Sequence, residues 1–215
     1  SVQEMADFVG IAFDLAFKYR NPAIILADGV IGQMMEKVVL PEQRTRLTDE
    51  EVIARCPWAT TGRTHHRTPN IITSLELDPA EMEKRNIHLQ KKYAEIEENE
   101  VRFEELHCED AEYLIVAFGS CARIAQKAME IAREEGIKVG LLRPITLWPF
   151  PSKAIAARAA QVKGILTVEL NAGQMVEDVR LAVECKVPVE HFGRLGGIVP
   201  DPDEVITALK EKLIK

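Results

Sequence analysis

Residues 113–142, YLIVAFGSCARIAQKAMEIAREEGIKVGLL, decide the fold of this 215-residue chain. The opening run YLIVAF is continuously apolar, which is typical of a strand buried on both faces. Residues 121–135 then place apolar side chains at helical spacing, and Gly136 is a residue type that often ends a helix. Residues 139–142 form a second apolar run. The stretch therefore predicts a strand, a helix and another strand in succession.

The same alternation continues to the end of the chain. A helix is predicted over residues 152–162, a strand over 165–170, a helix over 174–184 and a strand over 187–192. A last helix opens at Asp201, where Pro202 suits the first helical position and Glu204 has capping-box spacing. Regular alternation implies a parallel sheet with helices on both faces. We therefore predict that residues 110–215 form one doubly wound α/β domain.

Residues 1–40 have a different pattern. Ser1 and Glu4 have capping-box spacing, and apolar residues follow at helical spacing, so the chain is expected to open with a helix. Residues 23–27, AIILA, are expected to form a buried strand that turns into a short amphipathic run over residues 31–39. One buried strand leaves both of its edges unpaired. Its neighbours are therefore expected from a partner chain or from residues upstream of Ser1.

The middle of the chain, residues 41–109, is expected to be a linker. Residues 41–74 are rich in turn formers, and a long helix is predicted from Asp78 towards Leu106. Its narrow apolar stripe consists of Met82, Leu89, Ile96 and Phe103. We interpret this helix as a structural strut that docks along one seam.

Residues 141–151, LLRPITLWPFP, form an unusually apolar connection. Its three prolines forbid a helix or a central strand. Trp148 and Phe150 would be costly to expose to water, so the loop packs either against another subunit or domain, or inside this chain. The sequence favours the first interpretation.

Composition excludes several classes of function. A net charge of −7 disfavours a nucleic-acid surface, and no apolar run approaches the roughly 20 residues needed to cross a bilayer. The four cysteines stand alone, so they are expected to be reduced thiols rather than ligands of an iron–sulfur cluster. Reduced thiols are consistent with a cytoplasmic protein.

Four stretches carry a resemblance to a known family: residues 60–86 (TTGRTHHRTPNIITSLELDPAEMEKRN), 92–105 (KYAEIEENEVRFEE), 110–151 and 168–180 (VELNAGQMVEDVR). The chain resembles the C-terminal portion of the alpha subunit of 2-oxoacid:ferredoxin oxidoreductases, most of all the branched-chain type that acts on 2-oxoisovalerate. The resemblance implies that residues 1–40 are part of a thiamine-pyrimidine-binding α/β domain. It also implies that residues 110–215 are a transketolase C-terminal-like domain.

The resemblance implies a hetero-oligomeric, thiamine diphosphate-dependent enzyme that decarboxylates a 2-oxoacid, transfers the acyl group to coenzyme A and reduces ferredoxin. The alpha subunit would hold the pyrimidine, and a beta subunit would hold the diphosphate and Mg²⁺. Iron–sulfur clusters would lie only in beta and in a ferredoxin-like subunit, with a gamma subunit also present. This chain alone would be inactive. The alternatives are an alpha subunit specific for 2-oxoglutarate or pyruvate, and a non-catalytic dimerisation module.

The resemblance also suggests residues for the cofactor and for subunit contacts. Residues 27–37, ADGVIGQMMEK, resemble the family loop that faces the cofactor, which makes Asp28, Gly29 and Gln33 candidates; the alternative is an Asp-Gly turn that caps the next helix. No catalytic residue is assigned, because the activating glutamate belongs to the upstream half. Residues suggested for the subunit interface are Trp148, Phe150, Glu169, Asn171 and Gln174.

A basic cluster, Arg63, His65, His66 and Arg67, is a second candidate site. Arg63, His65 and Arg67 could bind the carboxylate of a substrate or the phosphates of coenzyme A, since arginine offers paired donors to such anions. The alternative is a solvated loop. Adjacent histidines without a third ligand do not make a zinc site, and no metal site is predicted.

Overall fold

The computed structural model describes residues 1–60 and 70–214, which form two compact units. The first unit comprises Ser1–Val38 and Lys92–Lys215, and the second comprises Val39–Lys91. Helix α4 (Pro79–Asn99) begins in the second unit and ends in the first. The candidate site lies entirely within the first unit.

A five-stranded sheet forms the centre of the first unit. Its strands are β1 (Phe103–Leu106), β2 (Tyr113–Ala117), β3 (Val139–Pro144), β4 (Ile165–Glu169) and β5 (Val189–Gly193), in the order β1-β3-β2-β4-β5. Strand β2 runs parallel to β3 and β4, and β4 runs parallel to β5. Only the edge strand β1 is antiparallel. The predicted α/β fold with a parallel sheet is confirmed.

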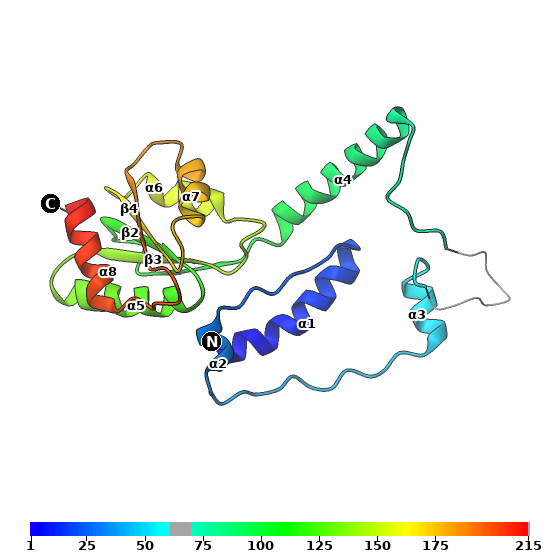
Figure 1. Ribbon diagram of the computed structural model, residues 1–215, viewed down its shortest axis with the longest axis horizontal. Helices are drawn as coiled ribbons and strands as arrows, with labels where there is room; N and C mark the ends of the chain where they lie inside the picture. Colours follow the sequence, from blue (N-terminus) through cyan, green and yellow to red (C-terminus); the bar gives the residue numbers. More distant parts are fainter. Residues whose placement is uncertain (61–69, 215) are drawn as a thin grey trace. The chain divides into compact units, whose positions relative to one another are not determined.

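Helices cover both faces of the sheet (Figure 1). One face carries α5 (Gly119–Glu134) and α8 (Pro202–Leu209), and the other carries α6 (Ser152–Ala159) and α7 (Met175–Val183). A short π-helix, Lys210–Ile214, follows α8. None of the helices in the described ranges combines the length and apolar composition required to span a membrane.

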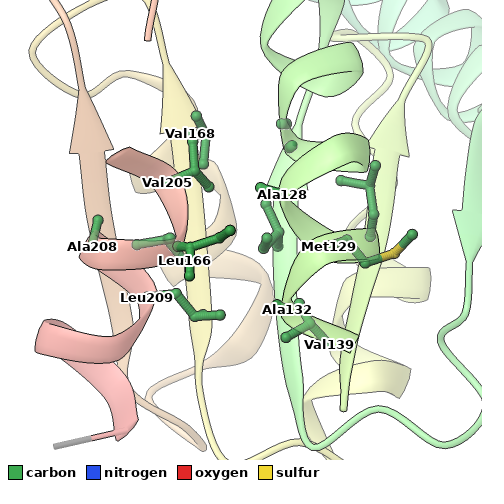
Figure 2. Close-up of a cluster of buried hydrophobic side chains, with 14 of the residues drawn as sticks. Ala128, Met129, Ala132, Val139, Leu166, Val168, Val205, Ala208 and Leu209 are labelled. Carbon is green, nitrogen blue, oxygen red and sulfur yellow. The ribbon is translucent and has the colours of Figure 1, made fainter. Parts of the chain in front are cut away.

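The apolar run of β2 contributes side chains to two hydrophobic cores, one on each face of the sheet. Ile115 and Ala117 pack on the α5 and α8 side, whereas Leu114 and Val116 pack on the α6 and α7 side. Alternate residues of a strand point to opposite faces, which is why every position in this run is apolar. Figure 2 shows part of the first core, built from Ala128, Met129, Ala132, Val139, Leu166, Val168, Val205, Ala208 and Leu209.

Two predictions about the linker are wrong. Helix α4 ends at Asn99, and the residues predicted to continue it form β1, which pairs with β3 in the register Phe103↔Pro144 to Leu106↔Leu141. Pairing with β3 gives the backbone N–H and C=O groups of these residues hydrogen-bond partners in the sheet. This gain outweighs the helical spacing of their side chains. The second unit also contains a helix, α3 (Asp49–Arg55), where the sequence predicted only turns. Thr48 and Glu51 form a capping box at its N-terminus.

The N-terminal segment begins as predicted and then departs from the prediction. Helix α1 (Val2–Tyr19) starts at the Ser1–Glu4 capping box. Residues 23–27 form no strand within this chain, and Ile24 is 88% exposed, so the segment is not buried by the described residues; its pairing with a partner chain or an upstream segment stays a prediction. All strands in the described part of the chain belong to the sheet of the α/β domain, which leaves this segment without a neighbour to pair with. Helix α2 (Gly29–Gln33) replaces the predicted run over residues 31–39.

Replacing Leu166 with alanine should lower the free energy of unfolding by about 2–5 kcal/mol, because the cavity left in a packed core relaxes only partly. Leu166 has no exposed surface in the structure. Urea unfolding followed by circular dichroism measures the change. Leu181→Ala is the matched control, since Leu181 is 77% exposed; it should shift stability by less than about 0.5 kcal/mol. Equal losses for the two variants would contradict the assigned core.

The more deeply a cysteine is buried, the less reactive its thiol should be. Removal from water raises the pKa of Cys108 to about 11 and that of Cys121 to about 12, whereas Cys185 is exposed. Because the thiolate is the reactive form, iodoacetamide at pH 8 should alkylate Cys185 and spare Cys108 and Cys121 until urea unfolds the chain. Mass spectrometry reads the sites, and Cys185→Ser should remove the Cys185 adduct. Rapid modification of Cys108 or Cys121 in the folded chain would refute the prediction.

Candidate functional site

A cleft of about 770 Å³ lies within the first unit. Its walls are formed by α1, residues 21–28, the start of α5, the loop 145–149 and the carboxyl end of β4. The carboxyl ends of parallel strands are where doubly wound sheets usually bind ligands. Four residues predicted from the sequence line this cleft: Asp28, Trp148, Glu169 and Asn171.

The Asp28 carboxylate joins two helix starts. Its Oδ1 accepts a hydrogen bond from the Ile31 backbone N–H at 2.9 Å, which caps α2. Its Oδ2 accepts from the backbone N–H and the hydroxyl of Ser120, at 3.0 and 2.7 Å, at the start of α5. The capping role that the sequence offered as an alternative for Asp28 is therefore present, together with a contact to a residue 92 positions away.

Helix α5 needs this partner because it has no cap of its own. Its N-cap residue is Phe118, whose side chain makes no capping hydrogen bond. The first N–H groups of a helix have no intrahelical acceptor, and a carboxylate also complements the helix dipole. Burial by itself would raise the pKa of Asp28, but the hydrogen bonds from Ile31 and Ser120 outweigh it and hold that pKa below its ordinary value.

The other two candidates for the cofactor loop differ from Asp28 in exposure. Gly29 and Gln33 are the first and last residues of α2, and both are exposed. Neither lines the cleft. The structure thus directs the Asp28 carboxylate inward and leaves Gly29 and Gln33 accessible for contacts outside this chain, and their role in cofactor binding stays a prediction.

Glu169 is buried and has a structural role. It is 1% exposed and accepts three backbone hydrogen bonds at the start of α7, from Gln174 (3.1 Å), Met175 (2.8 Å) and Val176 (3.0 Å). The Nδ1 atom of His191 lies 3.4 Å from its Oε1 atom. Its negative charge therefore compensates the positive end of α7 from inside the domain. A contact between Glu169 and another subunit stays a prediction.

The two neighbours of Glu169 that were predicted for an interface are closer to the surface. Asn171 is half-buried, and its Oδ1 accepts a hydrogen bond from the Gly173 N–H at 2.7 Å. Gln174 is the N-cap residue of α7, and its side chain is exposed and makes no capping hydrogen bond. Both residues can thus still contribute polar groups to a contact.

The apolar loop divides between interior and cleft. Phe150 packs against the core under α6 and α7. Trp148 lines the cleft, remains 53% exposed and meets Tyr93 edge to face, with ring centroids 5.8 Å apart. Phe150 is thus partly covered within this chain and Trp148 is available for a contact, whereas packing of either ring against another subunit stays a prediction.

The cleft also contains an ionic network that the sequence did not single out. Arg143 donates to Glu4 of α1 at 2.8 Å and to Glu104 of β1 at 2.9 Å. A single arginine inside the apolar run LLRP was the available signal.

A second ionic contact ties α1 to the end of α4. The nearly buried Glu100 accepts hydrogen bonds from Lys18 and from the Tyr19 hydroxyl, both at 2.7 Å. These bonds hold the pKa of Glu100 below its ordinary value. The two ionic contacts join α1 to the α/β domain.

The basic cluster of Arg63, His65, His66 and Arg67 lies outside the described residues. Within the ranges that the structure describes, no three histidine, cysteine, aspartate or glutamate side chains converge in a way that could hold a metal ion.

Glu169→Gln should destabilise the chain by about 1–3 kcal/mol, because an amide has one acceptor oxygen and leaves a buried N–H of α7 without a partner. Urea unfolding measures the loss. Glu130→Gln removes a partly exposed carboxylate from an i,i+3 pair with Lys127 and should change stability by at most about 0.5 kcal/mol. A Glu169→Gln variant as stable as the wild type would show that the capping bonds contribute nothing.

Comparison with known protein families covers nearly the whole chain. Residues 1–107 match the thiamine diphosphate-binding domain of pyruvate flavodoxin/ferredoxin oxidoreductases, and residues 111–205 match core domain II of pyruvate:ferredoxin oxidoreductase. The same fold occurs in a solved 2-oxoglutarate:ferredoxin oxidoreductase from Magnetococcus marinus, with a TM-score of 0.66, 23% identity, and coverage of 90% of this chain and 37% of that one.

Curated relatives agree with this assignment. The ketoisovalerate oxidoreductase subunit VorB of Methanothermobacter marburgensis is 46% identical over 98% of this chain and 58% of its own length. The 2-oxoglutarate synthase subunit KorA of Archaeoglobus fulgidus is 31% identical over 94% of this chain and 56% of its own length. The chain thus spans somewhat more than half the length of these relatives. It belongs to the family of 2-oxoacid:ferredoxin oxidoreductase subunits.

Proposed function

We propose that this chain is part of the alpha subunit of an oxidoreductase that converts a branched-chain 2-oxoacid, 2-oxoisovalerate, to its acyl-coenzyme A and reduces ferredoxin. One observation carries the choice of substrate. Identity is 46% to a ketoisovalerate oxidoreductase subunit but 31% and 29% to two 2-oxoglutarate synthase subunits, over similar spans of this chain. The branched-chain substrate is therefore better supported than 2-oxoglutarate.

Thiamine diphosphate supplies the electron sink for decarboxylation when it is bound. The match of residues 1–107 to a thiamine diphosphate-binding domain supports a role for the N-terminal segment in holding it. In this proposal Gly29 and the Gln33 amide, which are exposed beside the inward-facing Asp28, approach the pyrimidine end. A partner beta subunit holds the diphosphate and Mg²⁺, and iron–sulfur clusters lie in partner subunits.

The residues of this chain would orient the reactants and exclude water. Ile145, Leu147 and Trp148 give one wall of the cleft an apolar surface. Such a wall strengthens the electrostatic interactions inside a closed site. The basic cluster of Arg63, His65 and Arg67 is proposed to bind the substrate carboxylate or the phosphates of coenzyme A, because arginine offers paired donors to these anions.

The partners in this proposal are beta, gamma and ferredoxin-like subunits, ferredoxin and coenzyme A. The relatives named above are themselves described as subunits of oxidoreductases or synthases, which supports an assembly of several chains. The unpaired cysteines of this chain fit a reducing compartment, and we place the enzyme in the cytoplasm.

The intact enzyme that carries this chain tests the proposal. With coenzyme A, thiamine diphosphate and a viologen dye as electron acceptor, kcat/KM should be at least about tenfold higher for 2-oxoisovalerate than for pyruvate, since each methylene in an apolar pocket contributes roughly 10–200-fold. The preference over 2-oxoglutarate should be larger, because an apolar pocket leaves the second carboxylate unpaired. A higher kcat/KM for 2-oxoglutarate or pyruvate would favour the corresponding alternative. Assembly without turnover of any 2-oxoacid would indicate a non-catalytic module.

A further inference from the structure

We propose that Gly119 and Ser120 are positioning residues, which hold Asp28 and thereby fix the cofactor loop of residues 28–33 against the α/β domain. The proposal rests on the proposed function for the role of that loop, whereas the contact itself belongs to the fold. Gly119 and Ser120 lie in the wall of the cleft, and we assign them no direct contact with a ligand. Their effect on the site would be exerted entirely through Asp28.

The two oxygens of the carboxylate have separate tasks. Oδ1 holds the start of α2 through Ile31, and Oδ2 holds the start of α5 through both donors of Ser120. An asparagine could cap one helix, but its single acceptor oxygen cannot serve both, and its NH₂ group would meet another donor. The arrangement therefore requires a carboxylate specifically, although asparagine is an equally good helix cap.

Gly119 makes the close approach possible. Its backbone has φ of +59°, in the region that disfavours side chains, and an added Cβ would lie 3.1 Å from Asp28 Oδ2. Any other residue here would strain the backbone and crowd the carboxylate. The glycine thus permits the turn from β2 into α5 and also leaves room for Asp28.

The Ser120 contact is more protected than the polar contacts that Arg123 of α5 makes with Met34 and Glu36, just beyond the loop. Ser120 is 5% exposed. The contact between Arg123 and Glu36, at 2.7 Å, involves an arginine side chain that is half exposed. Exposed ion pairs contribute little to stability because water screens them. Among the polar contacts, the one between Asp28 and Ser120 therefore contributes most to the orientation of residues 28–33, beside the burial of Ile31.

A loop held in this way presents its exposed groups in one arrangement. If the contact is lost, the loop samples other arrangements. The cofactor can then bind only the fraction of molecules whose loop is in the binding-competent arrangement. The chemical step would be unaffected once the cofactor is bound. A positioning role therefore predicts weaker cofactor binding with an unchanged maximal rate.

The test uses Ser120→Ala and Asp28→Asn in the intact enzyme. The thiamine diphosphate concentration for half-maximal rate should rise roughly tenfold in each, which is the effect of losing one hydrogen bond to a charged group. At saturating cofactor, kcat of Ser120→Ala should stay within about twofold of the wild-type value. The double variant should bind the cofactor no more weakly than Asp28→Asn, because the hydroxyl bond that Ser120→Ala removes is part of the contact that Asp28→Asn already disrupts. Ser152→Ala and Asp203→Asn alter exposed residues of the same types and should match the wild type.

Hydrogen exchange on the 215-residue chain tests the contact without any assay of function. In Ser120→Ala, the amides of residues 29–33 should exchange faster than in the wild type and in Ser152→Ala. Unchanged exchange would overturn the proposed contact. Faster exchange with unchanged dependence on thiamine diphosphate would overturn its link to the cofactor. A wild-type enzyme with no thiamine-dependent turnover would refute the proposed function instead, and exchange would still decide whether Ser120 holds the loop.

Discussion

A helix that follows a parallel strand has backbone N–H groups without intrahelical acceptors at its start, and at α5 and α7 this constraint organises the carboxyl edge of the sheet. Neither α5 nor α7 has a capping side chain at its own N-cap residue. Asp28 supplies the acceptors for α5 from the N-terminal segment, and Glu169 supplies those for α7 from the end of β4. Each helix start thus receives a carboxylate that lies outside the helix.

This arrangement decides which ligands suit the cleft. Helix starts at the carboxyl edge of a doubly wound sheet commonly bind phosphates, because their free N–H groups attract anions. Here the starts of α5 and α7 already have anionic partners, so a phosphate would meet a carboxylate at both. The neutral pyrimidine end of thiamine fits such an edge better than the diphosphate end does. The charge pattern therefore supports the proposed division of the cofactor between this chain and a partner.

The sequence predicts the α/β core well because its signal is local. The run YLIVAF and the glycines after it mark a strand, a turn and a helix within about twenty residues. Strand β1 was missed because its sequence, FEEL, is short and polar, and only pairing with β3 identifies it as a strand. At the site, capping by Asp28 could be predicted from the Asp-Gly turn. Its contact with Ser120 could not, since the two residues lie 92 positions apart and no local pattern connects them.

The segment before Asp28 explains why this contact matters beyond the loop itself. Helix α1 is apolar on more than one face: Phe8 lines the cleft, while Phe13 is 62% exposed on the outside. Such helices typically lie between two layers of structure. Residues 23–27 are likewise extended, apolar and exposed, which is typical of a strand that pairs with another chain or segment. Asp28 follows these residues directly. Any strand that pairs with residues 23–27 would therefore hold the backbone on one side of Asp28, while Ser120 holds its side chain, and the cofactor loop would be fixed by both.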